Sequence, residues 1–171
     1  VQQDKLNPKS LNDRYFYDIY FDSKGNFWAG AYFGGVNVSH KTLQGVYHFR
    51  EDLSGQKLKG RVVKAFLEKG DEIWIGTEDS GVSIWDRKNN SWTLLSDKNR
   101  LPNNNIQSLL LDTDGNVWIG HFRGGITKIA ANGEFSFINK LSHTTVTSNL
   151  VISFLSQDKS GRIWVGTFDQ G

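Results

Sequence analysis

The sequence DTDGNVWIGHFRGG, residues 112–125, decides the fold because the chain contains it four times in related form. Its relatives are DSKGNFWAGAYFGG at 22–35, EKGDEIWIGTEDSG at 68–81 and DKSGRIWVGTFDQG at 158–171. Each copy has an acid six residues before a Trp, and Gly two and seven residues after it. These residues are Asp22, Trp28, Gly30 and Gly35; Glu68, Trp74, Gly76 and Gly81; Asp112, Trp118, Gly120 and Gly125; and Asp158, Trp164, Gly166 and Gly171. The Trp intervals of 46, 44 and 46 residues indicate a β-propeller.

Short apolar runs separated by turn residues predict four strands in each complete repeat. The predicted strands are 16–21, 27–32, 36–39 and 46–49; 62–67, 73–77, 82–85 and 92–95; 106–111, 117–121, 126–130 and 134–138; and 150–155 and 163–167. The fold class is therefore all-β, with repeats at about 14–50, 60–95, 104–138 and 150–171. This makes about 3.5 blades, whereas closed propellers usually have four to eight. We therefore expect a fragment of a larger propeller.

The first strand of each repeat is apolar on both faces, as FYDIYF and IQSLLL show. Such a strand fits the innermost position of a blade, between two neighbouring blades. The positions twelve and nine residues before each Trp are also apolar, so we expect the four Trp side chains to be equivalent and mostly buried between blades. The apolar residues are Phe16, Val62, Ile106 and Ile152, and Ile19, Ala65, Leu109 and Leu155.

The composition argues against several classes of protein. The 20 Lys and Arg are interspersed with 18 acids, which argues against a nucleic acid or an anionic membrane as partner. The absence of Cys excludes disulfides and thiolate chemistry. No apolar run approaches the length of a membrane helix, and no signal peptide opens the sequence.

The residues from Leu101 to Ile126 follow the pattern L-P-x-N-x-I-x-S-L-x-x-D-x-x-G-N-x-W-I-G-x-x-x-G-G-I. This pattern resembles the two-component regulator propeller repeat. The resemblance implies the periplasmic sensor region of a Bacteroidetes hybrid two-component system, a signal-transduction receptor that senses glycan fragments. It also implies a seven-bladed propeller, an inner-membrane anchor and a histidine kinase elsewhere in the parent protein.

The loops between second and third strands, with the connectors between blades, are expected on one face. Aromatic rings beside charged side chains in these loops suit a sugar, whose apolar faces stack and whose hydroxyls form hydrogen bonds. The ligand-binding candidates are Tyr32, Phe33, Glu78, Asp79, His121, Phe122, Arg123, Phe168, Asp169, Arg61 and Arg100; the connectors also hold Asn103 and His143. For each, a solvated or rim-packed loop residue is the alternative.

Other conspicuous residues favour structural roles. Asp22, Asp112 and Asp158 precede glycine turns, so their carboxylates are expected to bond backbone N–H groups rather than calcium. The four His, at 40, 48, 121 and 143, lack a metal-ligand spacing. Trp85 and Trp92 are expected to pair across strands. No catalytic set, cofactor or metal site is predicted.

Three functions remain open. The first is a non-enzymatic, extracytoplasmic sensor module that binds an oligosaccharide or a partner domain. The second is a propeller enzyme of the lyase or lactonase type, which would need clustered His and acids on a metal. The third is a structural scaffold without ligand contact. In each case the open blade faces are expected to associate with the remaining propeller blades or with a second copy of the chain.

Overall fold

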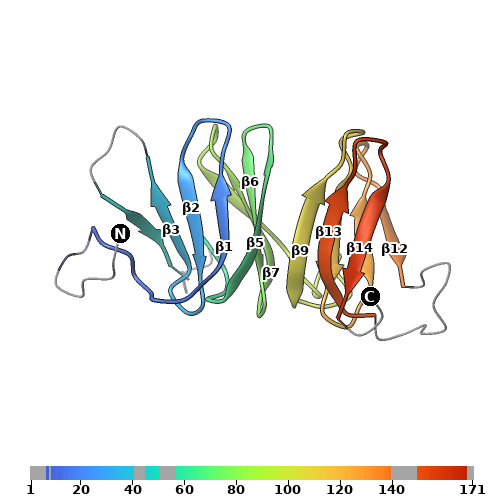
Figure 1. Ribbon diagram of the computed structural model, residues 1–171, viewed down its shortest axis with the longest axis horizontal. Helices are drawn as coiled ribbons and strands as arrows, with labels where there is room; N and C mark the ends of the chain where they lie inside the picture. Colours follow the sequence, from blue (N-terminus) through green and yellow to red (C-terminus); the bar gives the residue numbers. More distant parts are fainter. Residues whose placement is uncertain (1–6, 8, 41–44, 51–56, 140–149, 169–171) are drawn as a thin grey trace.

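The computed structural model describes residues 7, 9–40, 45–50, 57–139 and 150–168. These residues form fourteen strands in four antiparallel sheets, which confirms the all-β propeller fold (Figure 1). The strands are β1 Phe16–Phe21, β2 Phe27–Ala31, β3 Val36–Ser39 and β4 Tyr47–Phe49; β5 Val63–Lys69, β6 Glu72–Thr77, β7 Gly81–Asp86 and β8 Ser91–Leu95; β9 Ile106–Leu111, β10 Val117–His121, β11 Ile126–Ile129 and β12 Phe135–Ile138; and β13 Ile152–Gln157 and β14 Ile163–Thr167. Within this described part, no helix is long and apolar enough to cross a membrane.

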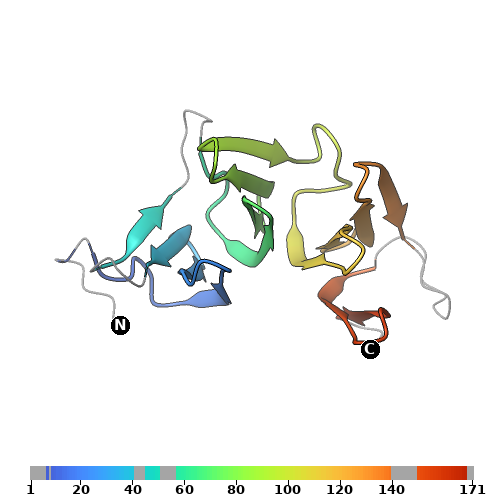
Figure 2. The ribbon, with the colours of Figure 1, turned by 90° about the horizontal axis from the view of Figure 1, so that it is seen from above.

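The four sheets, here blades 1 to 4, stand side by side along an open arc (Figure 2). The first strand of each blade lies on the inner side of the arc. The turns that join first and second strands lie at one face of the arc, at the top of Figure 1, and we call it the turn face. The opposite face carries the loops between second and third strands and the connectors into the next blade, and we call it the loop face.

Close packing against the next blade leaves no room for a side chain at the W-x-G glycine. A Cβ added at Gly30 would lie 2.7 Å from Cγ1 of Val63, and one at Gly120 would lie 2.5 Å from Cγ2 of Ile152. The β-branched residue at the start of each inner strand thus packs directly on the preceding blade's glycine. This contact explains why the motif pairs a glycine with an apolar residue in the following repeat.

The repeated aspartate closes the turn between first and second strands, as predicted. Asp112 accepts bonds from the N–H groups of Asp114 and Asn116 at 3.0 and 2.8 Å, and from the indole of Trp118 at 2.7 Å. Burial raises the pKa of Asp112, but these donors outweigh burial, and the pKa is lowered. Asp22 and Asp158 bind their turns and Trp residues in the same way.

Glu68, the acid six residues before Trp74, does not close the turn of blade 2 as the aspartates close theirs. In blade 2, Trp74 pairs across the strands with Leu67, which is seven residues before it. In blade 1, Trp28 pairs with Tyr20, which is eight residues before it. The turn of blade 2 is one residue shorter, so Glu68 lies on the strand and the indole of Trp74 donates to Glu72 instead. For the same reason, the residue that packs on Gly30 is Val63 rather than Val62.

The prediction of buried Trp side chains is wrong for Trp164, and the prediction of buried inner strands is wrong at both end blades. Trp28 and Trp74 are 1% and 6% exposed and Trp118 is half-buried, but Trp164 is 59% exposed. Strand β1 alternates between half-buried and exposed residues, and Phe154 in β13 is exposed. The physical reason is that no described blade covers the outer faces of blades 1 and 4.

Besides the backbone bonds of the loop glycines, which cross all three seams, side-chain hydrogen bonds from the inner strands cross two of the three seams among the described residues. At each of these two seams, one hydrogen bond is accepted by the inner-strand residue that pairs with the W-x-G glycine. There Asp18 accepts from the N–H of Phe66 at 3.0 Å, between blades 1 and 2. Ser108 accepts from the N–H of Leu155 at 3.1 Å, between blades 3 and 4. We call these the bonded seams.

The end of the inner strand supplies a second bond at the same seams. Glu68 accepts from the N–H and hydroxyl of Ser23 in the preceding blade's turn, at 2.7 and 2.8 Å. Gln157, at the corresponding position of blade 4, accepts from the N–H of Thr113 at 2.8 Å. Thus two bonds of the same design recur at the bonded seams.

The seam between blades 2 and 3 differs from both. Ala65 and Leu111 occupy the two bonding positions, and neither side chain can form these hydrogen bonds. A cluster of buried apolar side chains fills this seam instead, including Trp74, Leu109 and Ile119. We call it the apolar seam.

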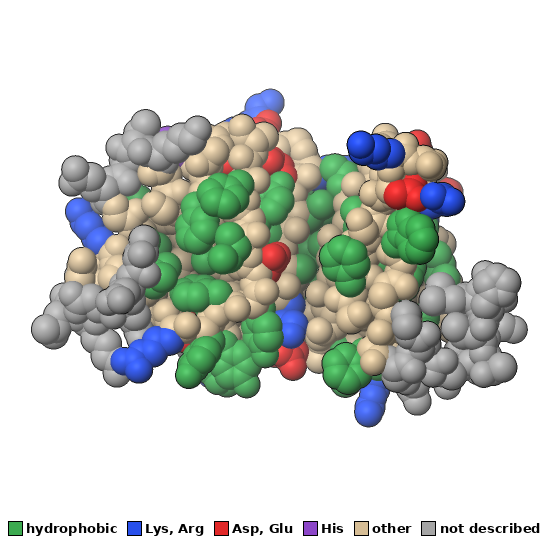
Figure 3. Space-filling view, in the orientation of Figure 1, with side chains coloured by type: hydrophobic (Ala, Val, Ile, Leu, Met, Phe, Trp, Pro, Cys, Tyr) green, Lys and Arg blue, Asp and Glu red, His purple; other side chains and the backbone are tan. Residues whose placement is uncertain are grey.

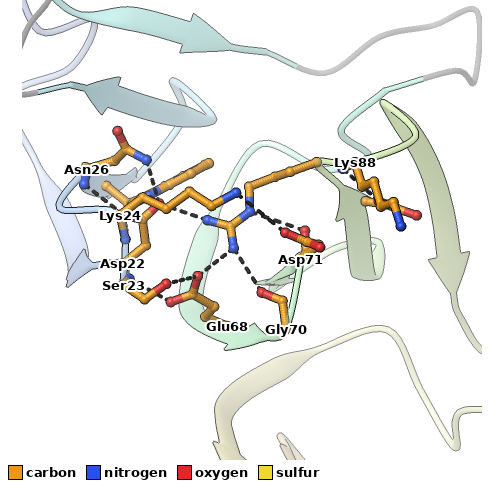
Figure 4. Close-up of polar contacts among 11 residues, drawn as sticks. Asp22, Ser23, Lys24, Asn26, Glu68, Gly70, Asp71 and Lys88 are labelled. Carbon is orange, nitrogen blue, oxygen red and sulfur yellow. Dashed lines mark hydrogen bonds and ion pairs between the residues drawn. The ribbon is translucent and has the colours of Figure 1, made fainter.

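Arg87 reinforces the first bonded seam at the turn face. Its guanidinium contacts Asp22 at 3.1 Å and Glu68 at 2.5 Å, and it also donates to the carbonyl of Gly70 at 2.9 Å (Figure 4). The three charged side chains are 7%, 0% and 11% exposed, so they form a buried ionic cluster. Because the cluster joins blades 1 and 2 and its side chains are almost wholly buried, we interpret it as structural.

Candidate functional site

The backbone holds the loop face rigid. In each blade the residue after the second strand donates to the carbonyl that precedes the first strand, as Tyr32 does to Tyr15 at 3.0 Å and Phe122 to Asn105 at 3.0 Å. The loop glycine then donates to the next blade's connector, as Gly35 does to Arg61 at 3.2 Å. Side chains on these loops are therefore presented from fixed positions.

Aromatic rings gather where blades 1 and 2 meet at the loop face. The ring of Tyr32 lies 5.5 Å from that of Tyr17 and 4.2 Å from that of Phe33. The ammonium group of Lys64 lies 3.6 Å above the ring of Tyr17. Burial and the charge of Glu78 raise the pKa of the Tyr17 hydroxyl. Exposed rings, an ammonium group and a carboxylate therefore share one surface, which Figure 3 shows as hydrophobic side chains over β1 and β2 with charged groups beside them.

Two hollows flank this aromatic group. One, of about 410 Å³, is lined by aromatic side chains: Tyr15, Phe16, Tyr17 and Tyr32. The other, of about 530 Å³, is lined by Asn12, Asp13, Phe33, Gly34, Gly35, Arg50 and Arg61. Burial raises the pKa of Asp13, but backbone donors led by Phe33 outweigh it, so the pKa is lowered. The second hollow therefore combines an ionised carboxylate with two guanidinium groups.

The candidates in blade 2 lie beside this group. Glu78 is half-buried and Asp79 is exposed on the loop after β6. One carboxylate oxygen of Asp79 accepts from the N–H of Arg61 at 3.4 Å. The structure thus brings Tyr32, Phe33, Glu78, Asp79 and Arg61 into one region.

His121 does not lie on an exposed loop, and that expectation is wrong. Its side chain is fully buried at the end of β10, where Nε2 lies 2.8 Å from the hydroxyl of Thr127. Burial lowers its pKa from 6.5 to about 4, so the ring is neutral at pH 7. The neighbouring Phe122 and Arg123 are exposed as expected, with the guanidinium 5.4 Å from the ring.

Two further candidates, Arg100 and Phe168, do not join the group. The guanidinium of Arg100 lies 4.9 Å from the ring of Phe135, in a hollow beside the turn before β12, and not with the loop residues of blade 2. Phe168 is 81% exposed at the far end of the arc. Asp169, like the connector residue His143, lies outside the described residues.

Sequence reasoning missed Tyr17 and Lys64. Both lie where the inner strand carries a β-bulge, between Phe16 and Asp18 in blade 1 and between Val63 and Ala65 in blade 2. A bulge turns one extra side chain out of the regular alternation. A polar or aromatic residue directly after the first apolar residue of each repeat could have revealed the bulge. In blade 2 the turn is one residue shorter, so Lys64 lies one position closer to the Trp than Tyr17 does in blade 1.

Three segments of the chain, residues 10–33, 100–123 and 145–169, match the model of the family described as two component regulator propeller. These three segments carry two-component regulator propeller repeats. The second repeat of the chain lies outside the matched segments, and it is the copy whose turn is shortened. A search of curated proteins gave no match.

Solved structures share the fold at low identity. The extracellular domain of BT4673 from B. thetaiotaomicron, a proposed hybrid two component system, aligns over 91% of this chain and 26% of its own, with TM-score 0.60 and 20% identity. PorZ of Porphyromonas gingivalis, a surface component of the type-IX secretion system, aligns over 100% and 27%, with TM-score 0.65 and 16% identity. Virginiamycin B lyase from Staphylococcus aureus aligns over 88% and 48%, with TM-score 0.61 and 18% identity. The regulator propeller chain thus spans about a quarter of the first two structures.

Proposed function

We propose that this chain is the ligand-sensing part of an extracytoplasmic signalling receptor of the hybrid two-component type. The regulator propeller repeats support this assignment, as does the similarity to the extracellular domain of BT4673. A periplasmic position, outside the inner membrane that anchors the parent receptor, is the location this proposal requires. The segment itself acts by binding and not by catalysis.

The proposed ligand is a glycan-derived oligosaccharide bound at the loop face. The observation that carries this proposal is the contiguous surface of Tyr17, Tyr32 and Phe33, with Lys64 and Glu78 at its edge. Sugar rings stack their apolar faces on exposed aromatic rings, and their hydroxyls need both donors and acceptors. The rigid backbone of the loops lowers the entropic cost of binding.

The lyase-type alternative has weaker support. Likeness to virginiamycin B lyase at 18% identity concerns the fold alone. That mechanism needs His and acids gathered on a metal, and no group of three such residues within the described part could hold one. Among the described residues, His121 at the end of β10 is buried against Thr127.

Calorimetric titration of the 171-residue chain tests the proposal. The probes are cellohexaose, xylohexaose and mannohexaose, which are neutral, and hexagalacturonate, which is acidic. We expect one of them to bind, and Tyr32→Ala to weaken that binding by several-fold to about tenfold, the range for one aromatic contact. Tyr47→Ala, which removes a 53% exposed Tyr from outer strand β4, is the matched control. Equal losses in both variants, or no binding of any probe, would contradict the proposal.

A further inference from the structure

We propose that the inner side of the arc holds an axial site for one acidic sugar unit, whose carboxylate binds Lys64. This inference rests on the proposed function, because it names the class of sugar and the side chains that select it. It starts from a hollow of about 440 Å³ that is lined by the inner strands of all four blades. These strands, β1, β5, β9 and β13, lie along the inner side of the arc (Figure 2).

Each of the four inner strands carries a β-bulge at the same place. In every blade the register shifts between the first residue of the strand and the third, which pairs with the W-x-G glycine. A bulge turns one extra side chain out of the regular alternation. The four bulge residues all line the hollow: Tyr17, Lys64, Gln107 and Ser153. The repeated geometry of the blades therefore gives the hollow one side chain from each blade.

The residues on either side of the bulge hold the blades together. The residue before it packs on the glycine of the preceding blade, as Val63 and Ile152 do. The residue after it accepts a hydrogen bond across the bonded seams, as Asp18 and Ser108 do. The bulge residues take no part in these contacts, and they differ in chemistry: a phenol ring, an ammonium group, an amide and a hydroxyl. A position that varies without disturbing the seams is suited to selecting a ligand.

Lys64 supplies the positive charge of the hollow. Its ammonium group lies 3.6 Å above the ring of Tyr17, and within the described part of the chain it forms no ion pair. Asp18 is the carboxylate among the described lining residues, but its oxygens already accept from the N–H groups of Ile19 and Phe66, at 2.8 and 3.0 Å. An ammonium group without a carboxylate partner favours an anionic group on the ligand, because charge-assisted hydrogen bonds are the strong ones.

The other bulge residues supply the remaining contacts that a sugar needs. Gln107 is half-buried, and its amide donates to the side-chain oxygen of Asn105, which fixes its position. Ser153 is exposed, and its hydroxyl can both donate and accept. Tyr17 is 47% exposed and offers its ring to the apolar face of a sugar. The four side chains together therefore match a hexuronate, which has a carboxylate, hydroxyls and an apolar ring face.

The axial site is continuous with the aromatic group of the loop face. Tyr17 lines both the axial hollow and the aromatic hollow, which it shares with Tyr32. An oligosaccharide stacked on the aromatic group can therefore place its terminal unit in the axial site. In this arrangement the aromatic group binds acidic and neutral sugars alike, and the axial site distinguishes between them.

Calorimetric titration with a charged and an uncharged form of one sugar tests the axial site. The probes are hexagalacturonate and its fully methyl-esterified form, which differ only in the charge and esterification of the carboxyl groups. We expect the native chain to bind hexagalacturonate at least about tenfold more tightly, as one hydrogen bond to a charged group requires. Lys64→Met should abolish this preference. Lys128→Met, which removes an ammonium group 5.0 Å from the ring of Trp118 and outside the hollow, is the matched control and should keep it.

Amide chemical shifts of the isotope-labelled native chain locate the bound sugar. Hexagalacturonate should shift the signals of Lys64, Gln107 and Ser153, and Gln107→Ala should weaken its binding several-fold. Tyr32→Ala should weaken both probes equally, because that ring belongs to the aromatic group.

Three results would overturn the axial site and leave the proposed function standing. They are equal affinity of the native chain for the two probes, a preference for hexagalacturonate that survives Lys64→Met, and binding of a neutral hexaose but of neither galacturonate probe. Chemical shifts confined to the loop face would also overturn it. Failure of every sugar to bind would contradict the proposed function as well.

Discussion

Replacement of Arg87 by Met should destabilise the chain strongly, because it leaves two buried carboxylates without their counter-ion. Arg87 contacts Asp22 at 3.1 Å and Glu68 at 2.5 Å, and its side chain is 7% exposed. Removal of one partner from a buried ion pair costs about 3–5 kcal/mol. We therefore expect the free energy of unfolding to fall by that amount.

Arg162→Met is the matched control for this variant. Arg162 also pairs with the turn aspartate of its blade, Asp158, at 2.7 Å, but its side chain is 72% exposed. An exposed pair contributes about 0–1 kcal/mol. The two variants remove the same type of contact and differ mainly in burial.

Urea unfolding followed by Trp fluorescence measures both variants. Addition of Glu68→Gln to Arg87→Met should recover part of the loss, since it removes one unpaired charge. Burial raises the pKa of Asp22, but donors led by Asn26 outweigh burial and the pKa is lowered, with Arg87 among the contributors. The stabilisation is therefore present above the ordinary carboxyl pKa of 3.8 and is lost as the pH falls below it. Equal losses for Arg87→Met and Arg162→Met at pH 7 would refute the assignment of a buried ionic clamp.

Three further predictions use the same unfolding assay. Gly120→Ala places a Cβ 2.5 Å from Ile152 and should cost about 1–3 kcal/mol, the usual range for overpacking; an unchanged stability would show that the two blades are not in contact there. His121 has an ordinary pKa of 6.5 and a folded pKa of about 4, so stability should fall by up to about 3 kcal/mol as the pH drops from 6.5 to 4, and His121→Thr should remove that slope. Asp112→Asn should cost about 1–3 kcal/mol, because the amide cannot serve as the acceptor for every donor now bound to the carboxylate, including the indole of Trp118; a loss equal to that of an exposed Asp114→Asn control would count against this role.

The sequence predicted the strands well because each repeat encodes them independently. The spacing of Trp118 from Gly120 and Gly125 recurs in every copy, and the strand bounds agree within one or two residues in most cases. The aspartate turns were also predictable, since Asp112 bonds N–H groups only two and four residues away. Local chemistry of this kind is visible in a pattern of residue types.

The features that the sequence did not predict depend on strand register and on contacts with adjacent blades. Glu68 resembles the turn aspartates only because a turn shortened by one residue places an acid at the same distance from Trp74. His121 lies at a strand end, where the side chain points into the blade rather than to solvent, and the Thr at this position in blade 2 is buried as well. The exposed rings of Tyr17 and Trp164 follow from a bulge and from an uncovered blade, neither of which residue types reveal.

The two kinds of seam limit the number of blades that a closed ring can contain without a mismatch. Across the three seams described, bonded and apolar seams alternate with a period of two blades, which matches the 90-residue spacings of Trp28 to Trp118 and Trp74 to Trp164. Strict alternation can close only around an even number of blades. A seven-bladed ring built on it must contain one frustrated junction, where a hydrogen-bonding residue meets an apolar surface. Cohesion is lowest at that junction, which makes it the place where such a ring opens first.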